Sequence, residues 1–131
     1  MDNNNRKPQI AVVDDEPAIR KSLVRLLGAA GLQVHVYASG RDMLDACKTM
    51  HFDCVLMDLQ MPGLNGFEVF EELRRADFRM PVILMTASGD PVVQKRASEL
   101  GFELLLLKPL DGELLLSSIR NLVGRVALKQ F

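Results

Sequence analysis

The sequence predicts one α/β domain, in which a doubly wound, five-stranded parallel sheet is covered by five helices. Five short apolar runs, each too short for a helix, alternate with segments of helical periodicity, and Gly, Pro and capping residues separate the two kinds of segment. This alternation is typical of parallel strands joined by right-handed crossovers, with helices on both faces of the sheet. A chain of 131 residues, 48% of them apolar and 25% charged, is long enough to bury such a core.

The predicted strands are the apolar runs IAVV, VHVY, CVLM, VILM and LLLL, at residues 10–13, 34–37, 54–57, 82–85 and 104–107. Three of these runs (IAVV, CVLM and VILM) are continuously apolar, and LLLL is the extreme case. Continuous apolar runs predict strands that are covered on both faces. The run VHVY alternates more because it carries His35, so we expect this strand nearer to an edge of the sheet.

Apolar residues recur every third or fourth position after each run and predict the five helices. In chain order they include Ile19, Leu23 and Leu26; Met43, Cys47 and Met50; Phe67, Phe70 and Leu73; Val93, Ala97 and Leu100; and Leu115, Ile119 and Leu122. Pro17 and Pro91 suit first helical positions, and Asn65 with Glu68 predicts a capping box. Gly101 lies where a helix C-cap is expected.

The domain is expected to cover residues 9–124, without internal repeats. We expect residues 1–8 to be a disordered lead-in and residues 125–131 to be a tail or the start of a linker. The polar N-terminus has no signal-peptide pattern and no stretch has membrane-span length, so we expect a cytoplasmic protein. Cys47 and Cys54 lack metal-ligand spacing and fit buried free thiols. A net charge of -1 gives no electrostatic footprint for direct binding of nucleic acid or an anionic membrane.

Reactive polar residues follow four of the five predicted strands. They are Asp14, Asp15 and Glu16 after the first strand, Asp58 after the third, Thr86 after the fourth and Lys108 after the fifth. The carboxyl ends of parallel strands share one edge of the sheet, and ligands bind at that edge. We therefore expect these side chains to converge, although they are far apart in the sequence.

The chemistry of such a cluster is restrictive. Carboxylates held close together raise each other's pKa unless a cation lies between them, and an all-oxygen site suits a hard ion such as Mg²⁺. Asp58, on the expected central strand, is the natural nucleophile, because a carboxylate can accept a phosphoryl group as an aspartyl phosphate. Mg²⁺, the Lys108 ammonium and the Thr86 hydroxyl would each contact a different phosphoryl oxygen.

The segments VVDDE, LMDLQMPGLNG, LMTAS and LLKPL, in this order, resemble the receiver domains of two-component response regulators over nearly the whole chain. The resemblance implies a flavodoxin-like fold and phosphorylation of Asp58 by a histidine kinase or a histidine phosphotransfer protein. It implies Mg²⁺ coordinated directly by Asp15, Asp58 and the backbone carbonyl of Gln60, with Asp14 acting largely through water. It also implies a cis peptide bond between Lys108 and Pro109.

The same resemblance implies a signalling phosphoacceptor and not an enzyme, with at most weak self-phosphorylation from small donors and weak autodephosphorylation. Phosphorylation would switch the face formed by the fourth helix, fifth strand and fifth helix, and so regulate an output domain or protein, as a monomer or a phosphorylation-dependent dimer. The stretch DDEPAIRKSLVRLLGAAGLQVHVYASG is most similar to the FixJ/LuxR-type transcription regulators, whose output domains bind DNA.

One position departs from the family pattern. Receivers usually carry Tyr, Phe or His three residues before the Lys, and here that residue is Leu105. The nearest aromatic residue in this segment, Phe102, is expected to pack elsewhere. We therefore expect Thr86 and its loop to move towards the phosphoryl group with a modified readout on the switch face.

Three other interpretations differ in how well they fit the sequence. A receiver that acts without phosphorylation, as a protein-binding module, is kept open by Leu105, although the complete set of acids, Thr86 and Lys108 argues against it. A phosphatase of the haloacid dehalogenase type needs DxDxT after the first strand, where this chain has DDEPA. A flavodoxin-type FMN carrier needs a phosphate loop rich in hydroxyls and glycine there. Taken singly, each polar strand end also fits a helix cap, a turn or a solvated charge.

Overall fold

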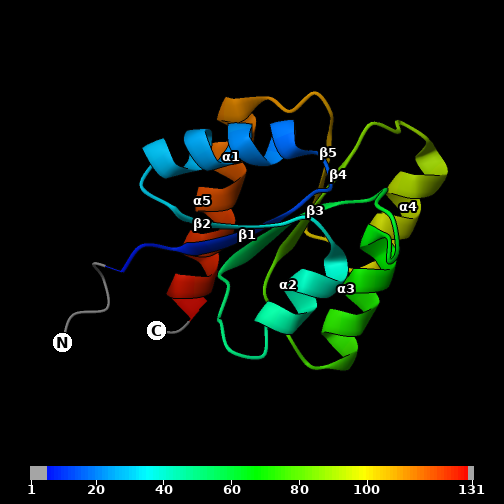
Figure 1. Cartoon of the computed structure of the whole chain (residues 1–131), viewed down its shortest axis with the longest axis horizontal. Helices are drawn as coiled ribbons and strands as arrows, with labels where there is room; N and C mark the ends of the chain where they lie inside the picture. Colours follow the sequence, from blue (N-terminus) through cyan, green and yellow to red (C-terminus); the bar gives the residue numbers. More distant parts are fainter. Residues whose placement is uncertain (1–5, 130–131) are drawn as a thin grey trace.

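The structure, a computed structural model, describes the backbone of residues 6–129 and the side chains of residues 6–124. Its strands are β1 (Gln9–Val13), β2 (Gln33–Tyr37), β3 (Cys54–Asp58), β4 (Val82–Thr86) and β5 (Leu104–Leu107). Its helices are α1 (Pro17–Ala29), α2 (Gly40–Ala46), α3 (Gly66–Arg75), α4 (Pro91–Leu100) and α5 (Gly112–Lys129). The strands form one parallel sheet in the order β2-β1-β3-β4-β5, with helices on both faces (Figure 1). The predicted fold class is confirmed.

The position of each strand in the sheet agrees with its hydrophobic pattern in four cases. The interior strands β1, β3 and β4 contain the runs IAVV, CVLM and VILM, and every residue of these runs is buried. Strand β2, whose pattern alternates, is at an edge as expected. Strand β3 is central, so Asp58 lies at the end of the middle strand.

The prediction for the fifth strand was wrong. LLLL was expected to be covered on both faces, but β5 is the second edge of the sheet. Leu104 and Leu107 are 38% and 47% exposed, and the two leucines between them are only half-buried. An edge strand has a neighbour on one side only, and its flanking helices α4 and α5 cover it incompletely. A run in which every residue is apolar contains no periodicity that would reveal this position.

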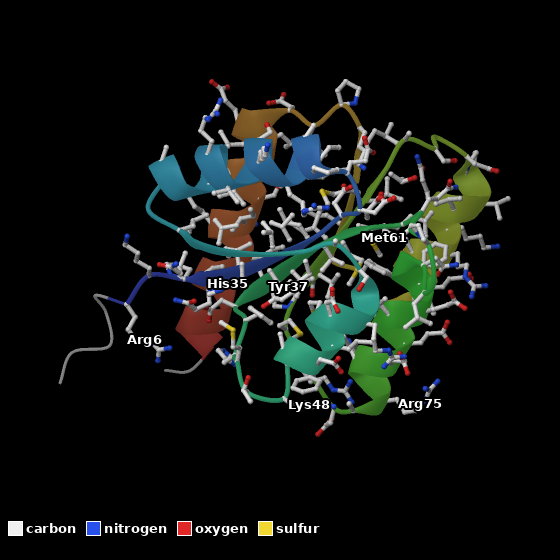
Figure 2. All side chains as sticks on the ribbon, viewed as in Figure 1. Arg6, His35, Tyr37, Lys48, Met61 and Arg75 are labelled. Carbon is white, nitrogen blue, oxygen red and sulfur yellow. The ribbon has the colours of Figure 1, made fainter. Side chains whose placement is uncertain are left out.

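Two apolar layers hold the helices against the sheet. One layer lies between the sheet and the helices α2, α3 and α4, and the other lies between the sheet and the helices α1 and α5. Neighbouring residues of β3 alternate between them, because Val55 faces the first layer and Leu56 the second. Figure 2 shows His35 and Tyr37 on the side of the sheet that α2 covers, where both rings contact Phe52.

The predicted punctuation is also present. Asn65 and Glu68 form a complete capping box at the start of α3, and Pro17 and Pro91 open α1 and α4. Gly101 ends α4 with φ 109°, in the left-handed region that favours glycine. The peptide bond between Lys108 and Pro109 is cis, and both cysteines are buried free thiols.

The ends of the chain are only partly described. Residues 6–8 have no helix or strand, whereas residues 1–5, expected to be disordered, and residues 130–131, expected to be in the tail, lie outside the described residues. Helix α5 extends to Lys129, past residue 124, because no Pro or Gly follows Gly124 to end it. Across residues 6–129, none of the helices has the length and apolar character that crossing a bilayer requires.

Candidate functional site

The polar residues that follow the strands meet at the carboxyl edge of the sheet. A pocket of about 610 Å³ opens there, lined by Asp15, Glu16, Asp58, Gln60, Thr86, Ala87, Ser88 and Lys108. These residues come from the ends of β1, β3, β4 and β5 and from the loops that follow them. The structure therefore brings together the residues that the sequence singled out, and places Asp14 beneath them, fully buried.

Asp14 is held by several hydrogen bonds. Its backbone N–H donates to the carbonyl of Tyr37 on β2, at 3.1 Å. Its Oδ1 accepts a hydrogen bond from the backbone N–H of Glu16 at 2.9 Å. Its Oδ2 accepts one from Lys108 Nζ, also at 2.9 Å. Because both carboxylate oxygens already have partners, Asp14 is suited to orienting its neighbours.

Asp58 is the last residue of β3 and is only 5% exposed. Burial is the largest influence on its carboxyl, and together with the negative charge of Asp14 it raises the pKa of Asp58 from 3.8 to about 6. Lys108 offsets part of this rise, because its Nζ lies 3.2 Å from Asp58 Oδ1. The Asp58 carboxylate is therefore mostly charged at neutral pH, in a site where added positive charge would stabilise it.

The Lys108 ammonium lies between the two buried carboxylates. Its side chain is 14% exposed, and its Nζ also lies 3.6 Å from Glu16 Oε1. Burial by itself would lower the pKa of Lys108, but the hydrogen bonds and charges of Asp14 and Asp58 outweigh burial and raise this pKa. The backbone N–H of Lys108 donates to the carbonyl of Thr86 at 2.9 Å, so the backbone from which the ammonium extends is held at the end of β4.

Three carboxylates form a possible cation site. Asp14, Asp15 and Asp58 each offer an oxygen, and these oxygens lie within 4.8 Å of one another. The group contains neither imidazole nor thiolate, so its donors suit a hard divalent cation such as Mg²⁺ better than a soft transition metal. Lys108 neutralises part of the negative charge, which leaves a net charge that still favours a cation.

Thr86 and Gln60 border the same pocket. Thr86 is buried, and its Oγ1 accepts a hydrogen bond from the backbone N–H of Ser88 at 3.1 Å. Glu16, which the sequence predicts at this edge without a specific role, also lines the pocket, and so does Ser88, which was not predicted. The closeness of Ser88 to Thr86 in the sequence is the signal that could have included it.

Gly66 was also not predicted, and it packs against the backbone of Asp58 at the start of α3. Its backbone N–H donates to the carbonyl of Leu59 at 2.8 Å. A Cβ at this position would lie 2.6 Å from the backbone oxygen of Asp58, closer than real Cβ contacts. Helix α3 can therefore begin directly against the end of β3 only if residue 66 has no side chain.

Leu105 is half-buried and packs against the apolar layer on the α3 and α4 side of the sheet. The nearby aromatic residue, Phe102, does pack elsewhere. Its ring stacks on Phe70 with centroids 4.2 Å apart and meets Phe67 edge-on at 5.9 Å. The position three residues before Lys108, where the resemblance implies an aromatic residue, is thus occupied by a leucine.

Comparison with known proteins agrees with this fold and site. The sequence profile of the response regulator receiver domain matches residues 10–120, and the chain belongs to this family of two-component signalling domains. Over 118 residues it is 36% identical to the transcriptional regulatory protein FixJ of Azorhizobium caulinodans, which covers 90% of this chain and 56% of FixJ. The similarity to FixJ-type regulators predicted from the sequence is confirmed. The chain spans about half the length of the curated relatives it matches.

Solved structures show the same architecture. The receiver domain of a signal transduction histidine kinase from Syntrophus aciditrophicus superimposes with a TM-score of 0.84 at 28% identity, over 91% of this chain and 92% of that one. The chemotaxis protein CheY4 of Vibrio cholerae gives a TM-score of 0.83 at 26% identity, over 89% of this chain and 99% of that one. Receivers with different biological roles thus share this fold.

Proposed function

We propose that this chain is a signalling phosphoacceptor whose Asp58 is phosphorylated by a histidine kinase or a histidine phosphotransfer protein. The observation that carries the proposal is a buried carboxylate that ends the central strand, lines the pocket and lies 3.2 Å from a lysine ammonium. Such a carboxylate is charged and faces the pocket, and a nucleophile requires both properties.

In the proposed reaction, an Asp58 oxygen forms a bond to the phosphorus of a phosphohistidine as the phosphorus–nitrogen bond breaks. The electron pair of that bond returns to the imidazole, which takes up a proton. Lys108 and Thr86 hold the phosphoryl oxygens by charge and hydrogen bonding, because phosphoryl transfer depends mainly on positioning and charge neutralisation. The chain is not an enzyme in this scheme, although small phosphodonors could supply the same group slowly.

Mg²⁺ is the cofactor that fits these residues. Asp15, Asp58 and the backbone carbonyl of Gln60 would hold it directly, and Asp14, whose oxygens are engaged by Glu16 and Lys108, would act largely through water. When bound, the ion would neutralise the charge that gathers on the phosphoryl oxygens. The support is the close group of carboxylate oxygens and the pKa of Asp58, raised by burial and by Asp14.

Phosphorylation would be read on the face made by α4, β5 and α5. Thr86 and its loop would move towards the phosphoryl group, and half-buried Leu105 would repack where other receivers turn an aromatic ring. The exposed apolar side chains Leu104, Leu107 and Leu114 on this face would contact an output domain, a partner protein or a second copy. Direct nucleic-acid binding and membrane attachment are not part of this proposal.

The test is a titration with Mg²⁺ and beryllofluoride, a phosphoryl mimic, followed by backbone amide NMR. In the wild type we expect Mg²⁺-dependent shifts at Asp58, Thr86 and Lys108, and we expect no such shifts in Asp58→Asn. Asp45→Asn, a change of an exposed carboxylate on α2, is the matched control and should respond like the wild type. Mass spectrometry after incubation with acetyl phosphate should find one phosphoryl group in the wild type and in Asp45→Asn, and none in Asp58→Asn.

The results distinguish a phosphoacceptor from a phosphorylation-independent binding module, and they also test the proposed switch. A wild type that shows no Mg²⁺-dependent response would refute phosphorylation and favour a phosphorylation-independent binding module. A response confined to the pocket would refute the proposed switch while leaving the phosphoacceptor role intact. Shifts that extend from Leu105 to α4 and α5 would support both.

A further inference from the structure

Asp14 has one further contact, which comes from outside the pocket. Arg20, on α1, extends its guanidinium to the residue that follows β1, and Nη1 donates to the backbone carbonyl of Asp14 at 2.8 Å. The other polar groups of Asp14 are bound by Tyr37, Glu16 and Lys108. Arg20 thus completes the hydrogen bonding of Asp14, which is fully buried. Asp14 is the first residue of the acidic loop, residues 14–16.

Among the residues that the structure describes, Arg20 has no acidic partner. No described carboxylate lies within 4.0 Å of its guanidinium, and α1 contains no acidic residue. The side chain is half-buried beside a groove lined by Pro17, Arg20, Lys21, Val24, Arg25 and Val36. The partner that the described residues give this cation is therefore the backbone carbonyl of Asp14.

The geometry of the Asp14 peptide matters for the neighbouring ligand. The carbonyl that Arg20 holds belongs to the peptide bond between Asp14 and Asp15, so its orientation limits where the Asp15 side chain can point. The Oδ1 of Asp14 accepts a hydrogen bond from the backbone N–H of Glu16, and this bond spans the same two peptide units. Holding this peptide therefore limits the backbone positions from which the Asp14 and Asp15 carboxylates extend.

We infer that Arg20 is a positioning residue that holds the acidic loop in the geometry that binds the divalent cation. The inference rests on the proposed function, because it concerns the cation that the phosphoacceptor site would use. Arg20 acts on the cation site through the Asp14 peptide and does not touch the pocket residues that would hold the phosphoryl group.

Charge and position predict opposite effects, which makes the inference testable. A positive charge near a cation site weakens binding of Mg²⁺, so removal of Arg20 would strengthen that binding if the residue acted by charge alone. If the residue positions the loop, its removal weakens the binding, and a loss of about tenfold is typical when a group that orients metal ligands is removed.

The experiment compares Arg20→Ala, Arg20→Lys and Lys21→Ala with the wild type. Lys21→Ala is the matched control, because it removes the same charge from the adjacent residue, which does not contact Asp14. Calorimetric titration gives the affinity for Mg²⁺, and amide hydrogen exchange of Glu16 in metal-free protein reports the order of the loop. Thermal unfolding is measured in parallel.

We expect Arg20→Ala to bind Mg²⁺ about tenfold more weakly and to exchange the Glu16 amide faster, and we expect Arg20→Lys to recover most of both. Lys21→Ala should bind Mg²⁺ as tightly as the wild type or slightly more tightly. A lower melting temperature in Arg20→Ala with unchanged affinity and exchange would overturn the inference, as would tighter binding. If the wild type itself binds no Mg²⁺, the proposed function fails, and the Glu16 exchange rate alone still decides whether Arg20 orders the loop.

Discussion

Replacing Asp58 by Asn should make the metal-free protein more stable at neutral pH. The pKa of Asp58 is raised from 3.8 to about 6, chiefly by burial and by the negative charge of Asp14. Between these two pH values Asp58 binds more protons in the folded protein than in the unfolded chain, so its contribution to the free energy of unfolding rises as pH falls through this window. Well above a pH of about 6 the carboxylate is fully charged and destabilises the fold by its full amount.

The size of this effect follows from the shift. One pKa unit corresponds to about 1.4 kcal/mol, and the rise from 3.8 to about 6 therefore amounts to about 3 kcal/mol. Asn keeps the shape of the side chain and removes its charge, but it does not reproduce every contact of a protonated acid. We expect Asp58→Asn to gain about 1–3 kcal/mol at about pH 7.5, and close to nothing below about pH 4.

The measurement is urea unfolding followed by far-ultraviolet circular dichroism, with a chelator present, at several pH values between about 4 and 7.5. Asp45→Asn, on an exposed surface, should change the free energy of unfolding by less than about 0.5 kcal/mol at every pH. A variant at position 58 that is no more stable than the wild type at about pH 7.5 would refute the reasoning, as would a gain that is equally large at about pH 4.

Two other changes test the same geometry. Lys108→Met removes the ammonium shared by two buried carboxylates, 2.9 Å from Asp14 and 3.2 Å from Asp58, and should lower the free energy of unfolding by about 3–5 kcal/mol. Urea unfolding measures this loss, Mg²⁺ should restore part of it, and an unchanged midpoint would contradict the proposed role of the ammonium. Gly66→Ala places a Cβ 2.6 Å from the Asp58 carbonyl and should cost about 1–3 kcal/mol. It should also weaken beryllofluoride binding in the NMR titration, whereas binding of wild-type strength would show that α3 can shift without moving Asp58.

The elements of the fold could be predicted because local pattern encodes them. Helical periodicity, Pro17, Pro91 and the Asn65 capping box act within one or two turns of chain, and the structure contains all of them. The β5 run shows where this information ends. Burial depends on a strand's place in the sheet, and four leucines at an edge look the same in sequence as four leucines in the centre.

The sequence by itself determined which chemical groups meet at one edge of the sheet, because parallel strands bring their carboxyl ends together whatever their order. Only the tertiary structure decided which of these groups contact one another. It placed the Lys108 ammonium between Asp14 and Asp58, although Lys108 and Asp14 are 94 residues apart in the chain. It also brought Arg20 to the Asp14 carbonyl. Hydrogen bonds of this kind depend on how separate elements pack against one another. A local pattern of residues does not encode the distances between such elements.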